Sequence, residues 1–99
     1  MALTAVESLL VTNTGYTAAN VPESILELLR SDLEAARTAI KRSGIDLDEE
    51  KAADVNLLVA YASWLFTRRR TGEGKPPMIS TEIRDRQVAR ATGGREDLP

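Results

Sequence analysis

The chain has 99 residues, of which 42% are hydrophobic and 28% charged, and its formal net charge is −2. This balance is typical of one soluble globular domain and argues against wholesale disorder. The sequence contains no cysteine and no histidine, which excludes disulfides and thiolate metal sites and removes the commonest general acid or base near neutral pH. We therefore expect a protein that is not an enzyme and that uses no cofactor and no metal.

The first residues, Met-Ala-Leu-Thr-Ala-Val-Glu, lack the basic segment and the long apolar run of a signal peptide. No other stretch has the length of a membrane span. We therefore expect a soluble protein that is made in the cytoplasm and has no membrane partner.

A short first helix is predicted over residues 4–12, because Thr4 and Glu7 have the spacing of a capping box. Residues 12–20 combine Gly15 with threonine, asparagine and alanine, a composition that favours a loop, although a short extended piece is an alternative.

A second helix is predicted over residues 21–43. Asn20 and Glu23 again have capping-box spacing, and Pro22 suits a first helical turn. Gly44 is placed to end the helix in the left-handed conformation, with Ile45 folding back on Ile40. Its apolar seam contains Leu26, Leu29, Leu33, Ala36 and Ile40.

The third predicted helix, residues 47–71, is the longest, and its N-cap is assigned to Asp46 or Asp48. Its apolar residues form two stripes instead of one. The first stripe contains Val55, Leu58, Val59, Ala62, Leu65 and Phe66, and the second contains Leu57, Tyr61 and Trp64. Either this is the central helix of a tight bundle, or the second stripe is a subunit interface formed by Leu57, Tyr61 and Trp64.

Two glycines and two prolines at residues 72–77 predict a break, followed by a fourth helix over residues 78–91 with Ser80 as its N-cap. That helix is sparsely apolar, so docking on a partner would help to hold it. Residues 93–99 have the composition of a mobile tail. The predicted fold is all-α: a small antiparallel bundle of three to four helices in one domain, residues 1–92, with an extended C-terminal arm.

Basic residues gather in the last third of the chain. Helix-end capping explains one or two of the three consecutive arginines at residues 68–70, because cations there complement the helix dipole. The remainder are candidates for a basic band that meets phosphates or an acidic protein. The candidate residues are Arg68, Arg69, Arg70, Arg84, Arg86 and Arg90.

Two ligand motifs fail on spacing. The acids from Asp46 onward resemble a calcium loop, but Lys51 and Leu57 occupy its glycine and glutamate positions. Around Gly74 and Lys75, Arg69 and Pro76 occupy the places of the first P-loop glycine and of the magnesium-binding hydroxyl. The acids are better explained as helix caps.

A family resemblance rests on four features: the long helix with Tyr61 and Ala62 at its middle, the basic exit at residues 68–70, the break at residues 72–77 and the arginine-bearing last helix. Together, over residues 20–92, they resemble the head-tail connector, or head-completion adaptor, proteins of long-tailed double-stranded DNA bacteriophages. The resemblance implies a helical protein that performs no chemistry and forms a ring, typically dodecameric, beneath the portal. Its implied partners are copies of itself, the portal protein, the next neck or tail-completion protein, and genomic DNA passing non-specifically through the channel.

The same resemblance implies a place in the virion neck, between capsid and tail, and in the host bacterial cytoplasm during assembly. The alternative function is a small helical DNA-binding regulatory protein, since a basic last helix suits a groove. Against this alternative, the sequence lacks the short turn between two compact helices that defines a helix-turn-helix.

Overall fold

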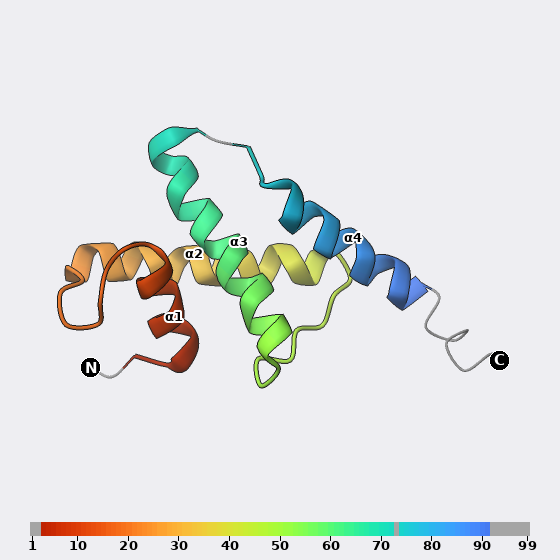
Figure 1. Cartoon of the computed structure of the whole chain (residues 1–99), viewed down its shortest axis with the longest axis horizontal. Coiled ribbons are helices and arrows are strands. Elements are labelled where there is room, and N and C mark those ends of the chain that lie inside the picture. The colour runs from red at the N-terminus through yellow and green to blue at the C-terminus, as the bar shows by residue number, and fades with distance from the viewer. Residues whose placement is uncertain (1–2, 73, 92–99) are drawn as a thin grey trace.

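The computed structural model describes residues 3–72 and 74–91, with only the backbone of Arg70 and Ala91. Its four helices are α1 (Ala5–Asn13), α2 (Glu23–Arg42), α3 (Ala52–Thr71) and α4 (Pro77–Ala91), which confirms the predicted all-α fold. In Figure 1, α3 crosses α2, and α3 and α4 form an inverted V. The segment between these two helices, residues 72 and 74–76 of the described chain, is called the connector below. The predicted tail, residues 93–99, lies outside the described residues.

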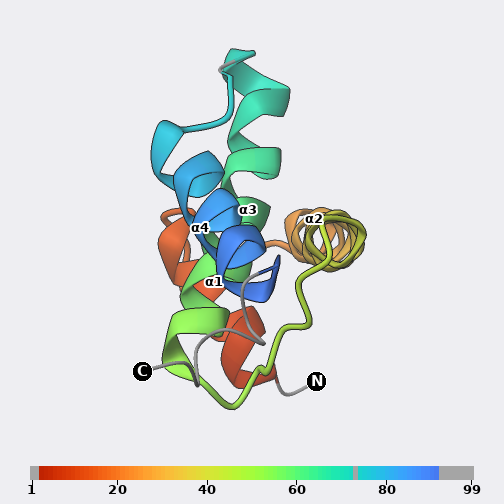
Figure 2. The same ribbon diagram turned by 90° about the vertical axis from the view of Figure 1, so that its right-hand side faces the viewer.

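The core is built around α3, which contacts each of the other three helices. Figure 2, which looks along α2, shows α3 passing beside it with α1 and α4 on the other side. The side chains of Leu58 and Ala62 are fully buried in this arrangement. A helix covered on several sides requires apolar residues on several sides, which explains the two stripes. None of the described helices is long and apolar enough to cross a membrane.

The start of α1 confirms the predicted capping box. Thr4 N donates to Glu7 Oε1 at 3.0 Å, and Glu7 N donates to Thr4 Oγ1 at 3.1 Å. The same glutamate accepts a 3.0 Å hydrogen bond from Arg30 Nε on α2. A local cap therefore also ties α1 to its neighbour.

The predicted N-cap of α2 is wrong. Asn20 Oδ1 accepts from Thr17 N at 2.8 Å and thereby closes a turn within the loop. The N-cap position is Pro22, in extended conformation and without a side-chain cap, and the helix begins at Glu23. Proline biases the residue before it, Val21, away from helical geometry, which explains the later start. The other end follows the prediction, since Gly44 has φ +88° and Ile45 N donates to Ile40 O at 3.4 Å.

The start of α3 is also corrected. The helix begins at Ala52 instead of residue 47, after Lys51, which provides no side-chain cap. Asp48 forms a turn of its own, since its Oδ1 accepts from Glu50 N at 3.0 Å. Asp54 Oδ2 accepts from Asp48 N at 2.7 Å and holds this turn against the first helical turn. The acids therefore order the approach to the helix.

The break between α3 and α4 lies where the sequence predicts it. Gly72 ends α3 with φ +71°, and its N–H donates to Arg68 O at 2.8 Å. The predicted N-cap of α4 is wrong, because Ser80 lies inside a helix that begins at Pro77. Proline is favoured at a first helical position, where its missing N–H has no partner to lose. At the start of α4 a backbone group, the carbonyl of Pro76, accepts a hydrogen bond from Ile79 N at 3.0 Å.

Candidate interaction surface

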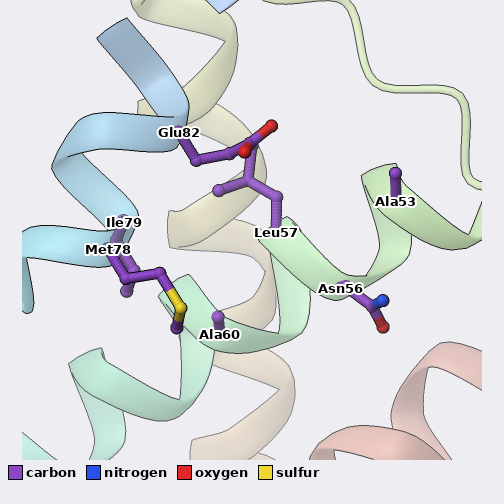
Figure 3. Close-up of a pocket in the computed structure, with 7 residues that line it drawn as sticks. All are labelled: Ala53, Asn56, Leu57, Ala60, Met78, Ile79 and Glu82. Atoms are coloured by element: carbon purple, nitrogen blue, oxygen red, sulfur yellow. The ribbon is translucent and has the colours of Figure 1, made fainter. Parts of the chain in front are cut away.

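An open groove runs between α3 and α4 (Figure 3). It has a volume of about 260 Å³ and is lined by Ala53, Asn56, Leu57, Ala60, Met78, Ile79 and Glu82. A second hollow adjoins it toward the connector and shares Ala60, Met78 and Ile79 with it. In Figure 3 the Met78 side chain reaches toward Ala60 across the groove. The small side chains of α3 leave this space, and most of the lining is apolar.

Beside the connector, two aromatic rings and two cations form a cluster, which we call the aromatic cluster. Its members are Tyr61, Trp64, Arg68 and Lys75. The rings of Tyr61 and Trp64 meet edge to face, with centroids 5.5 Å apart and an interplanar angle of 77°. Lys75 Nζ lies 5.0 Å from the centroid of Tyr61 and 5.4 Å from that of Trp64, and Arg68 Cζ lies 5.0 Å from Trp64. The cation–π contacts of Lys75 hold the connector against α3, whereas the contact of Arg68 with Trp64 lies within α3.

The second stripe of α3 is largely covered by the chain itself. Leu57 is 5% exposed and Tyr61 is 8% exposed, while Trp64 is half-buried. Leu57 also lines the groove between α3 and α4. Apolar character on this face is therefore explained by the central position of α3. Of the three residues predicted at a subunit interface, Trp64 retains accessible surface.

Arg86, predicted to face the portal or DNA, instead anchors α4 to α3. Its guanidinium bonds to Asp54, donates to Glu82 Oε2 at 2.7 Å and donates to Ala53 O at 3.2 Å. Burial acts to raise the pKa of Asp54, but hydrogen bonds from Asp48 N and Arg86 outweigh it, and the pKa lies below its ordinary value. A buried carboxylate and a largely buried guanidinium are thus neutralised together.

Arg69 is likewise engaged within the chain. Its Nη2 donates to Asp32 Oδ1 at 2.5 Å, and Asp32 is 2% exposed in the interface of α2 with α3. The second oxygen of Asp32 is buried without a hydrogen-bond partner among the described residues. Burial raises the pKa of Asp32, and the positive charge of Arg69 opposes that rise without cancelling it.

The remaining predicted arginines are dispersed. Arg68 covers Trp64, and Arg90 bonds to Gly44 O and lies 3.4 Å from Asp46 Oδ2. Arg84 is exposed on α4, and the side chain of Arg70 lies outside the described residues. The structure therefore brings Arg86 and Arg90 together as anchors of α4, and it does not gather the predicted arginines into one continuous basic band.

Two buried residues went unassigned at the sequence level, Ile79 and Asp32. Ile79 and Ile83 are buried and form the apolar side of α4. Asp32 stands between Leu29 and Leu33 in the buried seam of α2, so its helical position was the available signal. Among the residues that the structure describes, no group of three or more acidic side chains could hold a metal ion.

No protein-family model matches this sequence, and neither a curated protein nor a solved structure shows significant similarity to it.

Proposed function

We propose that this chain is a structural subunit that assembles with copies of itself, as the head-tail connectors that it resembles do. In that role it forms a ring under the portal of a long-tailed bacteriophage and extends the DNA channel toward the tail. Its partners are neighbouring copies, the portal protein and the next neck protein, with the genome passing through non-specifically. Its place is the virion neck after assembly in the bacterial cytoplasm, and it performs no chemistry.

The observation that carries this proposal is the relation of α4 to the bundle. Two isoleucines and a set of polar bonds hold α4 beside an apolar groove that stays open. Met78, at the rim of the groove, is 72% exposed. Large apolar side chains next to an open groove favour a protein contact.

The DNA-binding alternative receives less support. Arg69 and Arg86 are paired with buried carboxylates, so neither has its full charge available for a phosphate. Arg90 bonds to the loop after α2. A recognition helix needs polar side chains that extend into a groove, whereas Arg86, Gln87 and Arg90 of α4 bond to other parts of their own chain.

Native mass spectrometry and negative-stain microscopy test the proposal. The purified chain is examined over rising concentration, alone and with purified portal protein from the same phage genome. We expect closed rings, at least with portal present. A chain that stays monomeric at high concentration and leaves portal unbound contradicts the proposal. Tight, sequence-selective duplex binding at physiological salt would favour the DNA-binding alternative instead.

A further inference from the structure

The contacts that hold α4 come from two neighbouring parts of the chain, which we call the α4 seat. The apolar part of the seat lies on α3, and the polar part includes the loop after α2. Gln87 Nε2 donates to Ser43 O at 3.0 Å, and Arg90 bonds to Gly44 O. The members of the seat are Ser43, Gly44, Asp46, Ala53, Asp54, Leu57 and Ala60.

The seat and the helix are complementary in charge. Residues 46–54 carry five acids and one lysine. On α4, Arg86 and Arg90 reach this acidic segment at Asp54 and Asp46. Opposite charges at matched positions fix the register of a helix on its seat, whichever chain supplies the helix.

The connector gives α4 the freedom to leave its own seat. Gly72 has φ +71°, and neither Gly72 nor Gly74 has a neighbouring atom within 4 Å of the place where a Cβ would stand. Lys75, on Tyr61 and Trp64, is the described contact that holds this segment down. Glycines in open space absorb the dihedral changes of a hinge at low cost.

α4 also leaves apolar surface uncovered when it lies on its own seat. Met78 is 72% exposed and Val88 is 57% exposed. An α4 that is supplied by a neighbouring copy lies next to a second chain, whose surface can cover these side chains. Exchange of an identical element costs little because the same contacts re-form in the partner.

From these observations we propose that α4 exchanges between neighbouring copies, so that the α4 seat of one chain receives α4 of the next. The occupant of the seat is thus the α4 of a second copy of this chain. This inference rests on the proposed function, since exchange in one direction around a closed set of copies links each subunit to the next. Such a head-to-tail interface closes into a ring when its rotation permits.

Cysteine crosslinking tests the exchange, because the natural chain has no cysteine. Ala60→Cys places one thiol in the seat, and Met78→Cys places one on α4. Ala60 and Met78 line the same groove. One variant is labelled with ¹⁵N, and the two are unfolded, mixed, refolded and treated with a short bis-maleimide. Each chain then carries one thiol, so a bond between positions 60 and 78 joins two chains.

The matched control replaces Ala60→Cys with Ala35→Cys, an exposed alanine on α2 outside the seat. Circular dichroism establishes that each variant folds, and native mass spectrometry of the same samples gives the oligomeric state. We expect a several-fold excess of the bond between positions 60 and 78 over the control bond between positions 35 and 78.

Rings that give this bond only at the control level overturn the exchange and leave the ring function standing. In that case the double variant Ala60→Cys/Met78→Cys crosslinks within one chain. A chain that stays monomeric under every condition overturns the exchange and counts against the proposed function as well.

Discussion

Arg69 on α3 donates a 2.5 Å hydrogen bond to one oxygen of Asp32 on α2, while the other oxygen of that carboxylate is buried and has no hydrogen-bond partner in the part of the chain that the structure describes. The two ends of this pair differ in environment. Asp32 is enclosed in the helix interface, whereas about half of the Arg69 side chain remains in solvent. Removing one residue or the other should therefore have unequal effects on stability.

Arg69→Ala should destabilise the fold by about 1–3 kcal/mol, because it leaves a buried carboxylate with no partner. Asp32→Leu should stay within about 1 kcal/mol of the natural chain or exceed it, because it removes the buried charge and releases Arg69 to water. Urea unfolding followed by circular dichroism measures both. A larger loss for Asp32→Leu than for Arg69→Ala would contradict this explanation.

The same carboxylate predicts a pH dependence of defined sign. Burial raises the pKa of Asp32 above its ordinary value of 3.8, so the folded chain binds this proton more tightly than the unfolded chain. The stability that proton binding to Asp32 contributes is present below the ordinary pKa and is lost as the pH rises through the pKa of Asp32 in the folded chain. The free energy of unfolding of Asp32→Leu, minus that of the natural chain, should therefore increase from pH 3 upward and then level off.

Other carboxylates act in the opposite direction. Hydrogen bonds from Thr4 N to Glu7 and from Arg37 to Glu49 lower their pKa values, so these groups lose stabilising interactions as pH falls. Both proteins share these groups, and their effects cancel in the difference. A difference that stays flat across the acid range would contradict the assignment to Asp32.

Arg86→Met should loosen α4 and leave the rest of the bundle intact. The methionine keeps the aliphatic stem but leaves Asp54 without its guanidinium. Amide hydrogen exchange in residues 77–91 should accelerate by about tenfold, which corresponds to about 1.4 kcal/mol of local stability. Exchange in α2 should remain unchanged. Arg84→Met, at an exposed position on the same helix, is the control and should alter exchange little.

Thr4→Ala should remove one half of the capping box of α1 and cost about 1 kcal/mol of stability. Thr12→Ala, at an exposed position inside α1, is the matched control and should be neutral or slightly stabilising, because alanine has the higher helix propensity. Thermal unfolding followed by circular dichroism compares the two. Equal losses at both positions would show that the cap contributes nothing specific.

Local sequence patterns predicted the helices and the clearest signals for where they begin and end. The helical spacing of Leu29, Leu33 and Ala36 predicted a buried face, and all three are buried. Gly44 and the Thr4 capping box depend on neighbours within a few residues, so sequence spacing was sufficient. The prediction that Asn20 caps α2 was wrong because the Asn20 side chain can either cap the helix or close a local turn. It closes the turn by accepting from Thr17 N.

The polar contacts of the candidate surface could not be predicted in the same way. Arg86 and Asp54 are separated by 32 positions, and Arg69 and Asp32 by 37. Which arginine meets which acid depends on how α4 and α3 fold back on the chain, and a count of basic residues carries no such information. The sequence therefore predicts which arginines are candidates for the basic band, but it does not predict the acids with which Arg69 and Arg86 pair.

The aromatic cluster gives this molecule a fluorescent reporter. Trp64 is the one tryptophan of the chain, and it contacts Lys75 of the connector that must move if α4 leaves its seat. The fluorescence emission of Trp64 should therefore differ between the isolated chain and the assembled oligomer if the connector opens, and no attached dye is needed. Following this emission after rapid mixing gives the rate of opening.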